Sequence, residues 1–440
     1  MTNPPGLGRL ASGVLWGAYA LVLLLTPLVL DSSLSQTLLA QMGITIIACL
    51  SFNLLLGQGG MLSFGHAVYT GMGAFLAMHT LNRVSAGWPL PVSLVPLVGG
   101  VGSLLLALLL GWVTTRKSGT AFAMITFGMG ELVWALALVL PDWFGGEAGV
   151  SGNRVAGSVV FGISLGPQRQ LNVLICFYTL VCTWLMFAFT QTPLGRMLNA
   201  VRDNAERVAF VGYDPHRVRF LAFVVSSFFA GVAGGLAALN FELVTADVLS
   251  AQRSGAYLLF TVLGGTGYFV GPIIGAVLMV LSFVLLSSFT KAWLLYVGLM
   301  FVGMVMLAPG GVAALVMAQV RLLRQQGAWR ALGGAYLAVL LAAAVALAGL
   351  VALVEMLYHL QQLAALGPVL PFGGVQLDVQ QAGSWMGAGL LLLTGLACLR
   401  VSYRQWVRRH QGWLSLRNAP DTPGTLVETE ANGTSKGLRS

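Results

Sequence analysis

The sequence predicts an all-α protein that crosses a membrane many times. Hydrophobic residues make up 57% of its 440 residues and charged residues only 8%, and the mean hydropathy is +0.84. Soluble domains of this length do not have such a composition, whereas polytopic helical membrane proteins do. A spanning helix needs roughly 20 apolar residues, and apolar runs of about that length follow one another along most of the chain.

Ten apolar segments make up the predicted core, and two more follow it. The eighth segment is too short to cross a bilayer unaided, so we expect a broken or re-entrant helix there, which is tolerated where backbone is buried in protein. We divide the chain into a membrane core (1–315), an extension with two further spans (316–410) and a polar tail (411–440) whose composition favours disorder. The predicted spans are 10–30, 34–56, 63–82, 89–113, 119–140, 172–190, 219–240, 254–265, 270–289, 293–308, 331–355 and 384–400.

The basic residues predict the orientation of these spans. If the N-terminus lies inside, 18 of the 23 Lys and Arg fall in inner segments, and the other five fall in outer segments. Cytoplasmic loops carry an excess of Lys and Arg, so both termini are expected in the cytoplasm. The same distribution explains the net charge of +9 without any binding of nucleic acid. The five outer residues are Arg83, Arg154, Arg169, Arg253 and Lys291.

Nothing in the sequence predicts an enzyme. It has no phosphate-binding Gly-x-x-x-x-Gly-Lys loop, no HExxH motif, no paired CxxC and no nucleophile elbow. The four cysteines lie in apolar runs without metal-ligand or disulfide spacing, and the five histidines are scattered. We therefore expect no catalytic, cofactor-binding or metal-binding residue, and ATP-driven work would require a separate ATPase.

One polar stretch, residues 191–219, lies between two apolar runs and predicts an amphipathic helix at the cytoplasmic surface. Thr192 and Pro193 form an N-cap and first-turn proline, and Gly212 is a C-terminal stop. Arg202–Glu206 and Asp203–Arg207 are expected to pair four residues apart. Such a helix is suited to meet another protein, although a charged loop that only fixes orientation is an equal alternative. The apolar stripe comprises Leu194, Met197, Leu198, Val201, Ala205 and Val208.

Two Gly-rich stretches, 57–75 and 262–276, interrupt the apolar core. Breaks at matching places in two halves predict an internal repeat around a midplane pathway, while close helix packing through small residues is the alternative. Glu131 lies within a span, where an ionisable group costs ~2.5–3.5 kcal/mol. It would bond unwound backbone or a substrate ammonium, and His66 would line the pathway or simply pack. The predicted pathway residues are Ser63, His66, Thr126, Glu131, Gly264, Gly265 and Gly267.

These stretches resemble, in order over about residues 34–315, the permease family of branched-chain amino acid ABC importers. The cytoplasmic coupling-loop motif matches Thr192, Pro193, Gly195, Arg196, Ala200, Arg202, Asp203, Asn204, Gly212 and Tyr213. The first Gly-rich motif and the one after it match Asn53, Gly57, Gly60, Ser63, Gly65, His66, Ala67, Arg116, Gly119, Phe122, Ala123, Thr126 and Glu131. Later motifs match Gly145–Gly152, Gly264, Gly265, Gly267, Gly271, Pro272, Gly275, Ala308, Pro309, Gly311 and Val312. The two C-terminal spans depart from the family, and no function is assigned to them.

The resemblance implies the larger of the two permease types, in the lipid of a bacterial inner (plasma) membrane. Its partners would be a second permease, two cytoplasmic ATP-binding subunits and a periplasmic substrate-binding protein. The substrate would be leucine, isoleucine, valine or a similar amino acid, with urea, short amides or aromatic acids as alternatives. A stand-alone secondary transporter that uses Glu131 and His66 as ion sites is a further alternative. The ATPase-coupling residues would be Arg196, Arg202, Asp203, Glu206, Gly212 and Tyr213.

Overall fold

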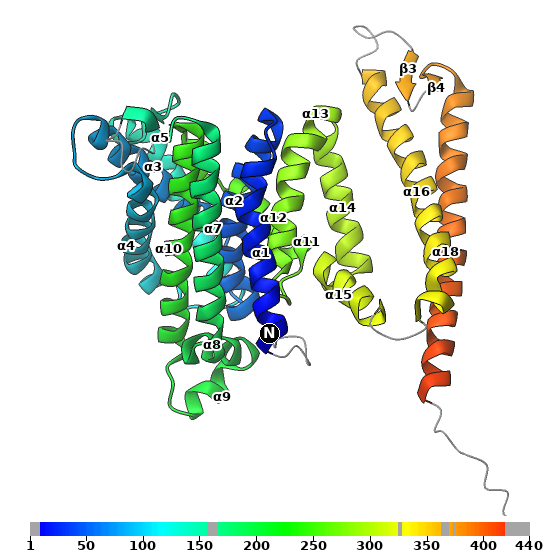
Figure 1. The fold of residues 1–440 in the computed structure, drawn as a ribbon, viewed down its shortest axis with the longest axis horizontal. Helices are drawn as coiled ribbons and strands as arrows, with labels where there is room; N and C mark the ends of the chain where they lie inside the picture. Colours follow the sequence, from blue (N-terminus) through cyan, green and yellow to red (C-terminus); the bar gives the residue numbers. More distant parts are fainter. Residues whose placement is uncertain (1–8, 157–164, 324–327, 362–368, 373–374, 419–440) are drawn as a thin grey trace, which may run out of the picture. The chain divides into compact units, whose positions relative to one another are not determined.

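The structure is a computed structural model that describes residues 9–156, 165–323, 328–361, 369–372 and 375–418. The chain forms two compact units, divided between Ala318 and Gln319 (Figure 1). The predicted all-α fold is confirmed, because helices make up nearly all of the described chain. Its strands form two short antiparallel pairs, β1 (Val150–Ser151) with β2 (Leu243–Val244) and β3 (Val369–Phe372) with β4 (Val375–Asp378). The predicted tail lies outside the described residues from position 419 onwards.

The first unit is a bundle of helices. Its long helices are α1 (Arg9–Val29), α2 (Ser33–Asn53), α3 (His66–Ser85), α4 (Val95–Thr114), α5 (Thr120–Val139), α7 (Gln168–Gln191), α10 (Pro215–Phe241), α11 (Ala251–Gly264), α12 (Gly271–Val280), α14 (Trp293–Leu307) and α15 (Gly311–Leu323). The other helices are α6 (Pro141–Phe144), α8 (Pro193–Asp203), α9 (Ala205–Phe210) and α13 (Ser287–Phe289). π-helical turns extend α2 over Leu54–Gln58 and α12 over Leu281–Leu286.

Within the described ranges, eight helical stretches are long and apolar enough to cross a membrane. They include six in the first unit and both predicted spans of the extension. As expected, the eighth predicted segment is short: α11 has 14 residues and ends at a Gly-rich break. The tenth predicted segment, 293–308, is the helix α14, and after it the chain bends by 57° and continues as α15.

Helices α2 and α10 form the centre of the first unit, with 72% of each spanning window buried. Helix α10 packs against α3 and α4 through small residues. A Cβ added to Gly234 would lie 1.8 Å from the Thr70 carbonyl oxygen, so only glycine allows the α3 and α10 backbones to approach so closely. Outward-facing apolar residues on α4 and α5, such as Leu109 and Met124, are exposed in the chain alone, as expected for contact with lipid.

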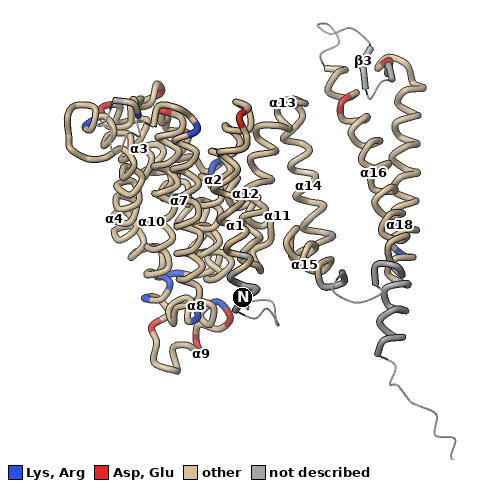
Figure 2. The backbone as a smooth tube through the Cα atoms, viewed as in Figure 1, with Lys and Arg blue, Asp and Glu red and all other residues tan. Residues whose placement is uncertain are grey.

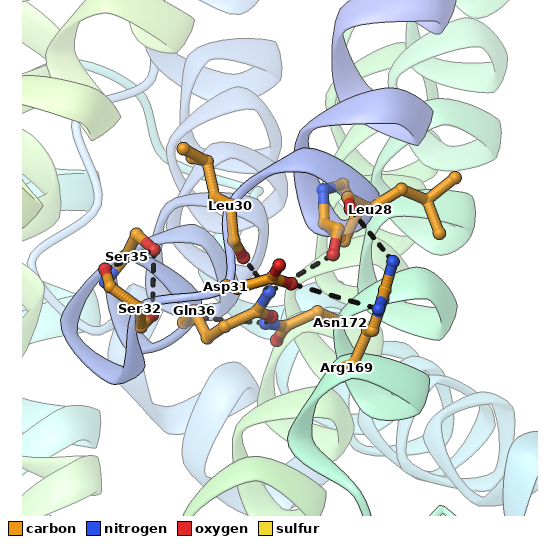
Figure 3. Close-up of polar contacts among 9 residues, drawn as sticks. Leu28, Leu30, Asp31, Ser32, Ser35, Gln36, Arg169 and Asn172 are labelled. Atoms are coloured by element: carbon orange, nitrogen blue, oxygen red, sulfur yellow. Dashed lines mark hydrogen bonds and ion pairs between the residues drawn. The ribbon is translucent and has the colours of Figure 1, made fainter.

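The charged residues of the first unit gather mostly toward the two ends of its helices (Figure 2). One end carries α8 and α9 together with the start of α1, and the opposite end carries α13 (Figure 1). At that opposite end, a polar cluster joins the α1–α2 turn to α7 (Figure 3). Arg169 donates to the Leu28 carbonyl at 2.9 Å, and buried Asn172 donates to the Gln36 carbonyl at 2.9 Å. The cluster gives the turn polar partners that an apolar bundle would otherwise lack.

The second unit contains an antiparallel helical hairpin. Its helices are α16 (Ala328–Gln361) and α18 (Ala382–Asn418), and β3 and β4 lie between them in the sequence. The helices cross closely where Gly349 faces the backbone of Leu392 and Gly395 faces Ala346. Both predicted C-terminal spans, 331–355 and 384–400, are therefore helices, and α18 continues well beyond the predicted end.

Candidate functional site

The polar stretch after α7 begins as its sequence predicts. The Thr192 hydroxyl oxygen accepts a hydrogen bond from the Gly195 amide at 3.2 Å, and Pro193 occupies the first position of α8. A Cβ at Gly195 would lie 2.3 Å from the Phe189 carbonyl oxygen. Glycine at this position therefore allows α8 to fold back tightly against the end of α7.

The prediction of one uninterrupted helix is wrong, because Asn204 divides the stretch into α8 and α9. Asn204 is extended (φ −161°, ψ 101°), and its side-chain oxygen accepts from the Arg207 amide at 2.9 Å. Asparagine favours such caps over helix interiors because its side chain competes for backbone groups. Residues four apart across the break no longer lie one helical turn apart, so the expected Arg202–Glu206 and Asp203–Arg207 pairs lose the helix geometry that they require. Arg202 instead contacts Asp203, at 3.0 Å.

The predicted apolar stripe is confirmed as the buried face of α8 and α9. Leu198, Val201 and Val208 are buried, and they pack in one cluster with Met61 and Phe223 from the bundle. The other stripe residues, Leu194, Met197 and Ala205, are partly buried against the same cluster. The stripe thus seats α8 and α9 on the bundle and leaves their opposite face open.

The open face ends in an exposed apolar tip. Phe210 is 90% exposed, Val211 70% and Tyr213 52%. Gly212 has φ +94°, and the Tyr213 amide donates to the Val208 carbonyl at 3.3 Å, so the predicted glycine stop of the helix is confirmed. Phe210 and Val211 were not among the predicted coupling residues. Two apolar residues directly before a glycine stop are the signal that would have identified them. Arg196, Asp203 and Glu206 also lie on exposed positions of this face.

Helix α8 is bound to the start of the first Gly-rich break. The Asn199 side-chain amide donates to Gln58 Oε1 at 2.8 Å, and the Arg202 guanidinium donates to the Gly57 carbonyl. Gln58 is buried and ends the π-helical extension of α2. Sequence reasoning did not identify Asn199 or Gln58, since no local pattern relates residues 141 positions apart. These bonds connect α8 directly to the carboxyl-terminal end of α2.

The first break, between Gln58 and His66, packs against α5. The Phe64 amide donates to the Thr126 hydroxyl at 3.2 Å, and Thr126 donates to the Ala123 carbonyl at 2.9 Å. His66 is fully buried, with Nε2 2.9 Å from the Ser51 hydroxyl and its ring edge-on to Phe52. Ser63 is also fully buried, and its hydroxyl has no hydrogen-bond partner among the described residues.

The second break, between α11 and α12, lies in contact with the first. A Cβ at Gly57 would lie 2.6 Å from the Thr266 carbonyl oxygen. Gly265 has φ +108° and faces the Gly310 carbonyl, whereas Gly267 has open space around it. Gly264 lies against the start of α12, with its Cβ position 2.1 Å from the Gly271 carbonyl oxygen. The structure therefore brings both breaks and α8 together at one end of the bundle.

Glu131 lies apart from this group, on α5, which is only 28% buried. It makes no hydrogen bond or ion pair with any residue that the structure describes. The expected bond to unwound backbone is therefore not seen. The roles predicted for Glu131 and the other six pathway residues stay predictions.

A cavity of about 80 Å³ lies between α2, α3, α10, α11 and α12. None of the seven predicted pathway residues lines it. Its polar lining includes Gln41, Thr45 and Arg253. Sequence reasoning counted Arg253 only as an outer charge; its position at the start of an apolar helix was the available signal. The described residues contain no group of three or more His, Cys, Asp or Glu that could hold a metal ion.

Comparison with known proteins agrees with this architecture. Residues 35–310 match the family described as branched-chain amino acid transport system / permease component. The high-affinity branched-chain amino acid transport system permease protein LivM of Salmonella typhimurium is 29% identical over 301 residues, which cover 63% of this chain and 70% of that protein. LivH of Escherichia coli K12 is 22% identical over 264 residues, covering 55% of this chain and 82% of LivH.

A probable LivM permease of Methanocaldococcus jannaschii is 25% identical over 291 residues, covering 58% of this chain and 82% of that protein. No solved structure matches the chain. The family match covers well over half of the 440 residues and includes α2, both breaks, α8 and α9. The chain therefore belongs to the permease-component family of branched-chain amino acid transport systems, with LivM-type proteins among its relatives.

Proposed function

We propose that the chain is a permease subunit of an ABC importer that carries leucine, isoleucine, valine or similar amino acids through a bacterial inner membrane. It would work beside a second permease and receive substrate from a periplasmic binding protein. Two separate cytoplasmic subunits would hydrolyse ATP. The relatives named as branched-chain amino acid permeases support this substrate class over urea, amides or aromatic acids. They also give no support to a stand-alone secondary transporter.

The observation that carries the proposal is the attachment of an exposed surface element to a broken helix. The tip formed by Phe210, Val211 and Tyr213 is free to enter a hollow on another protein, and exposed aromatic residues are typical anchors at such interfaces. Behind the tip, Asn199 and Arg202 hold Gln58 and Gly57. An ATPase that moves the tip would thereby move the inner end of α2, and the coupling residues Arg196, Asp203 and Glu206 would flank the contact.

The charges support the orientation that this mechanism requires. The segment with α8 and α9 carries Arg196, Arg202 and Arg207, and α10 begins with Arg217 and Arg219. An excess of Arg marks the cytoplasmic side, which is where ATP is available. In the proposed orientation the N-terminus of α1 would lie on the cytoplasmic side and α13 on the periplasmic side.

Uptake measurement tests the function. The chain is expressed with its own partner subunits in cells that lack branched-chain amino acid importers, and initial uptake of labelled leucine is followed. We expect uptake that requires the ATPase subunit and is competed by isoleucine and valine. Uptake that persists with an ATPase subunit inactivated in its nucleotide site would contradict the proposal. So would an assembled complex that moves none of these amino acids.

A further inference from the structure

The cavity between α2, α3, α10, α11 and α12 combines one unpaired cation with an apolar wall. Arg253 is half-buried, and its guanidinium makes no hydrogen bond or ion pair with a residue that the structure describes. The apolar wall includes Ile44, Val280 and Phe283. A half-buried positive charge beside apolar side chains is costly to maintain unless an anionic group reaches it.

The position of Arg253 within α11 adds a second argument. It lies in the first turn, after the Ser250 cap, where a cation is disfavoured by the helix dipole and an anion is favoured. Helix stability therefore gives no reason for an arginine here. An anion in the cavity would interact favourably with both the guanidinium and the amino-terminal end of α11.

The cavity has room for more than a single water. Its volume of about 80 Å³ is several times the roughly 10–15 Å³ that one water needs. Gln41 and Thr45 line the cavity, and their side chains make no hydrogen bond with a described residue, so they offer oxygen atoms to an ammonium group.

The cavity also lies where an incoming substrate would arrive. Arg253, Phe241 and Val248 come from the α10–α11 region, and Gln41 comes from the first half of α2. Helix α10 starts next to α8 and α9, so Phe241 at its other end lies away from them (Figure 1). The carboxyl-terminal end of α2 is bound to α8, so Gln41 lies in the half of α2 farther from α8. Thr70, one turn into α3, also lines the cavity and is four residues from the end of the first break.

We propose that this cavity is a binding station for a free amino acid, in which Arg253 holds the carboxylate and the wall formed by Ile44, Val280 and Phe283 holds an apolar side chain. The inference rests on the proposed function and extends it by assigning a substrate site within this chain. Gln41 and Thr45 receive the ammonium group. Residues of the second permease are free to complete the open side of the station.

The test uses the assembled importer and initial uptake of labelled leucine, with the amount of complex measured by co-purification. We expect Arg253→Gln to lower uptake at least tenfold at an unchanged amount of complex. Arg253→Lys keeps the charge and should lose less. Arg83→Gln removes a charge from the end of α3, outside the cavity, and should keep the wild-type rate.

A second variant tests the cavity independently, in case the Arg253 variants fail to fold. Thr45→Phe places a ring in the cavity and should lower uptake at least fivefold, whereas Thr37→Phe, on the same helix but outside the cavity, should not. If the Arg253 variants do not assemble, the Thr45 result decides alone. Wild-type uptake in Arg253→Gln or in Thr45→Phe would overturn the proposal, as expected if the cavity held a lipid phosphate instead. Failure of the wild-type chain to support uptake would refute the proposed function, not the site.

Discussion

The hydrogen bond between Asn199 and Gln58 is the most direct test of how α8 acts on the bundle. Its donor and acceptor atoms are 2.8 Å apart, Gln58 is buried, and both partners are side chains that mutation can replace. A neutral hydrogen bond of this kind contributes about 0.5–1.5 kcal/mol. Because about 1.4 kcal/mol corresponds to a factor of ten, loss of the bond should change the uptake rate about two- to tenfold.

The assay is a double-mutant cycle on ATP-driven leucine uptake, with the rate corrected for the amount of complex. Asn199→Leu and Gln58→Met each remove the bond while keeping most of the side-chain volume. Since both variants break the same bond, the double variant should lose less than the product of the two single losses, although Asn199 also donates to the Gly195 carbonyl. As a control, Gln58→Met is combined with Arg196→Ala. The two losses should multiply, because Arg196 is exposed and its side chain makes no hydrogen bond or ion pair with a described residue.

The result that would refute the reasoning is a product of the two single losses in the Asn199–Gln58 double variant. The two side chains would then act through separate contacts. In that case the Asn199–Gln58 bond would not transmit motion from α8 to α2, and the Arg202–Gly57 bond and the packing of Leu198 with Met61 would be the remaining candidates for that link.

Three further predictions follow from the breaks and from the polar cluster. Gly265→Ala should destabilise the chain by about 1–2 kcal/mol because of its positive φ alone, and the Gly310 oxygen 2.5 Å from the new Cβ should add to that loss. Gly267→Ala, whose Cβ would lie in open space, should be near neutral. Thermal unfolding in detergent measures both. Gly57→Ala should lower both uptake and thermal stability, because its Cβ would lie 2.6 Å from the Thr266 oxygen where the two breaks meet; unchanged values would show that the breaks are separable. Asn172→Ala should cost about 1–3 kcal/mol because it leaves the buried side-chain oxygen of Gln36 without its donor, whereas Arg169→Ala, whose ion pair is largely exposed, should cost under about 1 kcal/mol. Equal losses at the two positions would contradict that ranking.

Local patterns were sufficient to predict most elements. Apolar run length located the spans, Thr192 with Pro193 located the start of α8, and Gly212 located the stop after α9. The break at Asn204 was not predicted, because the apolar stripe continues on both sides of it and therefore predicted one helix. The asparagine itself, directly after Asp203, was the local signal that competed with that stripe.

Contacts between segments that are far apart in the chain could not be predicted from the sequence. Three features depend on how α2, α8 and α11 pack: the contact between the two breaks, the Asn199–Gln58 bond and the cavity at Arg253. The spacing of residues in the sequence does not predict that packing. Ser63 and His66 were predicted from their position after a glycine turn. The structure buries both, and polarity alone could not distinguish a pathway wall from a packed interior.

The central claim is that the tip on α9 docks with a separate ATPase, and co-purification tests it most directly. The tagged chain is isolated in mild detergent with its partners, and the ATPase subunit is quantified by mass spectrometry for wild type, Phe210→Ala and the control Phe289→Ala. Both phenylalanines are highly exposed, 90% and 84%, and they lie at opposite ends of the first unit. The account predicts that Phe210→Ala loses most of the ATPase while Phe289→Ala retains it. Equal recovery of the ATPase with both variants, or a chain that purifies without any ATPase, would contradict the claim.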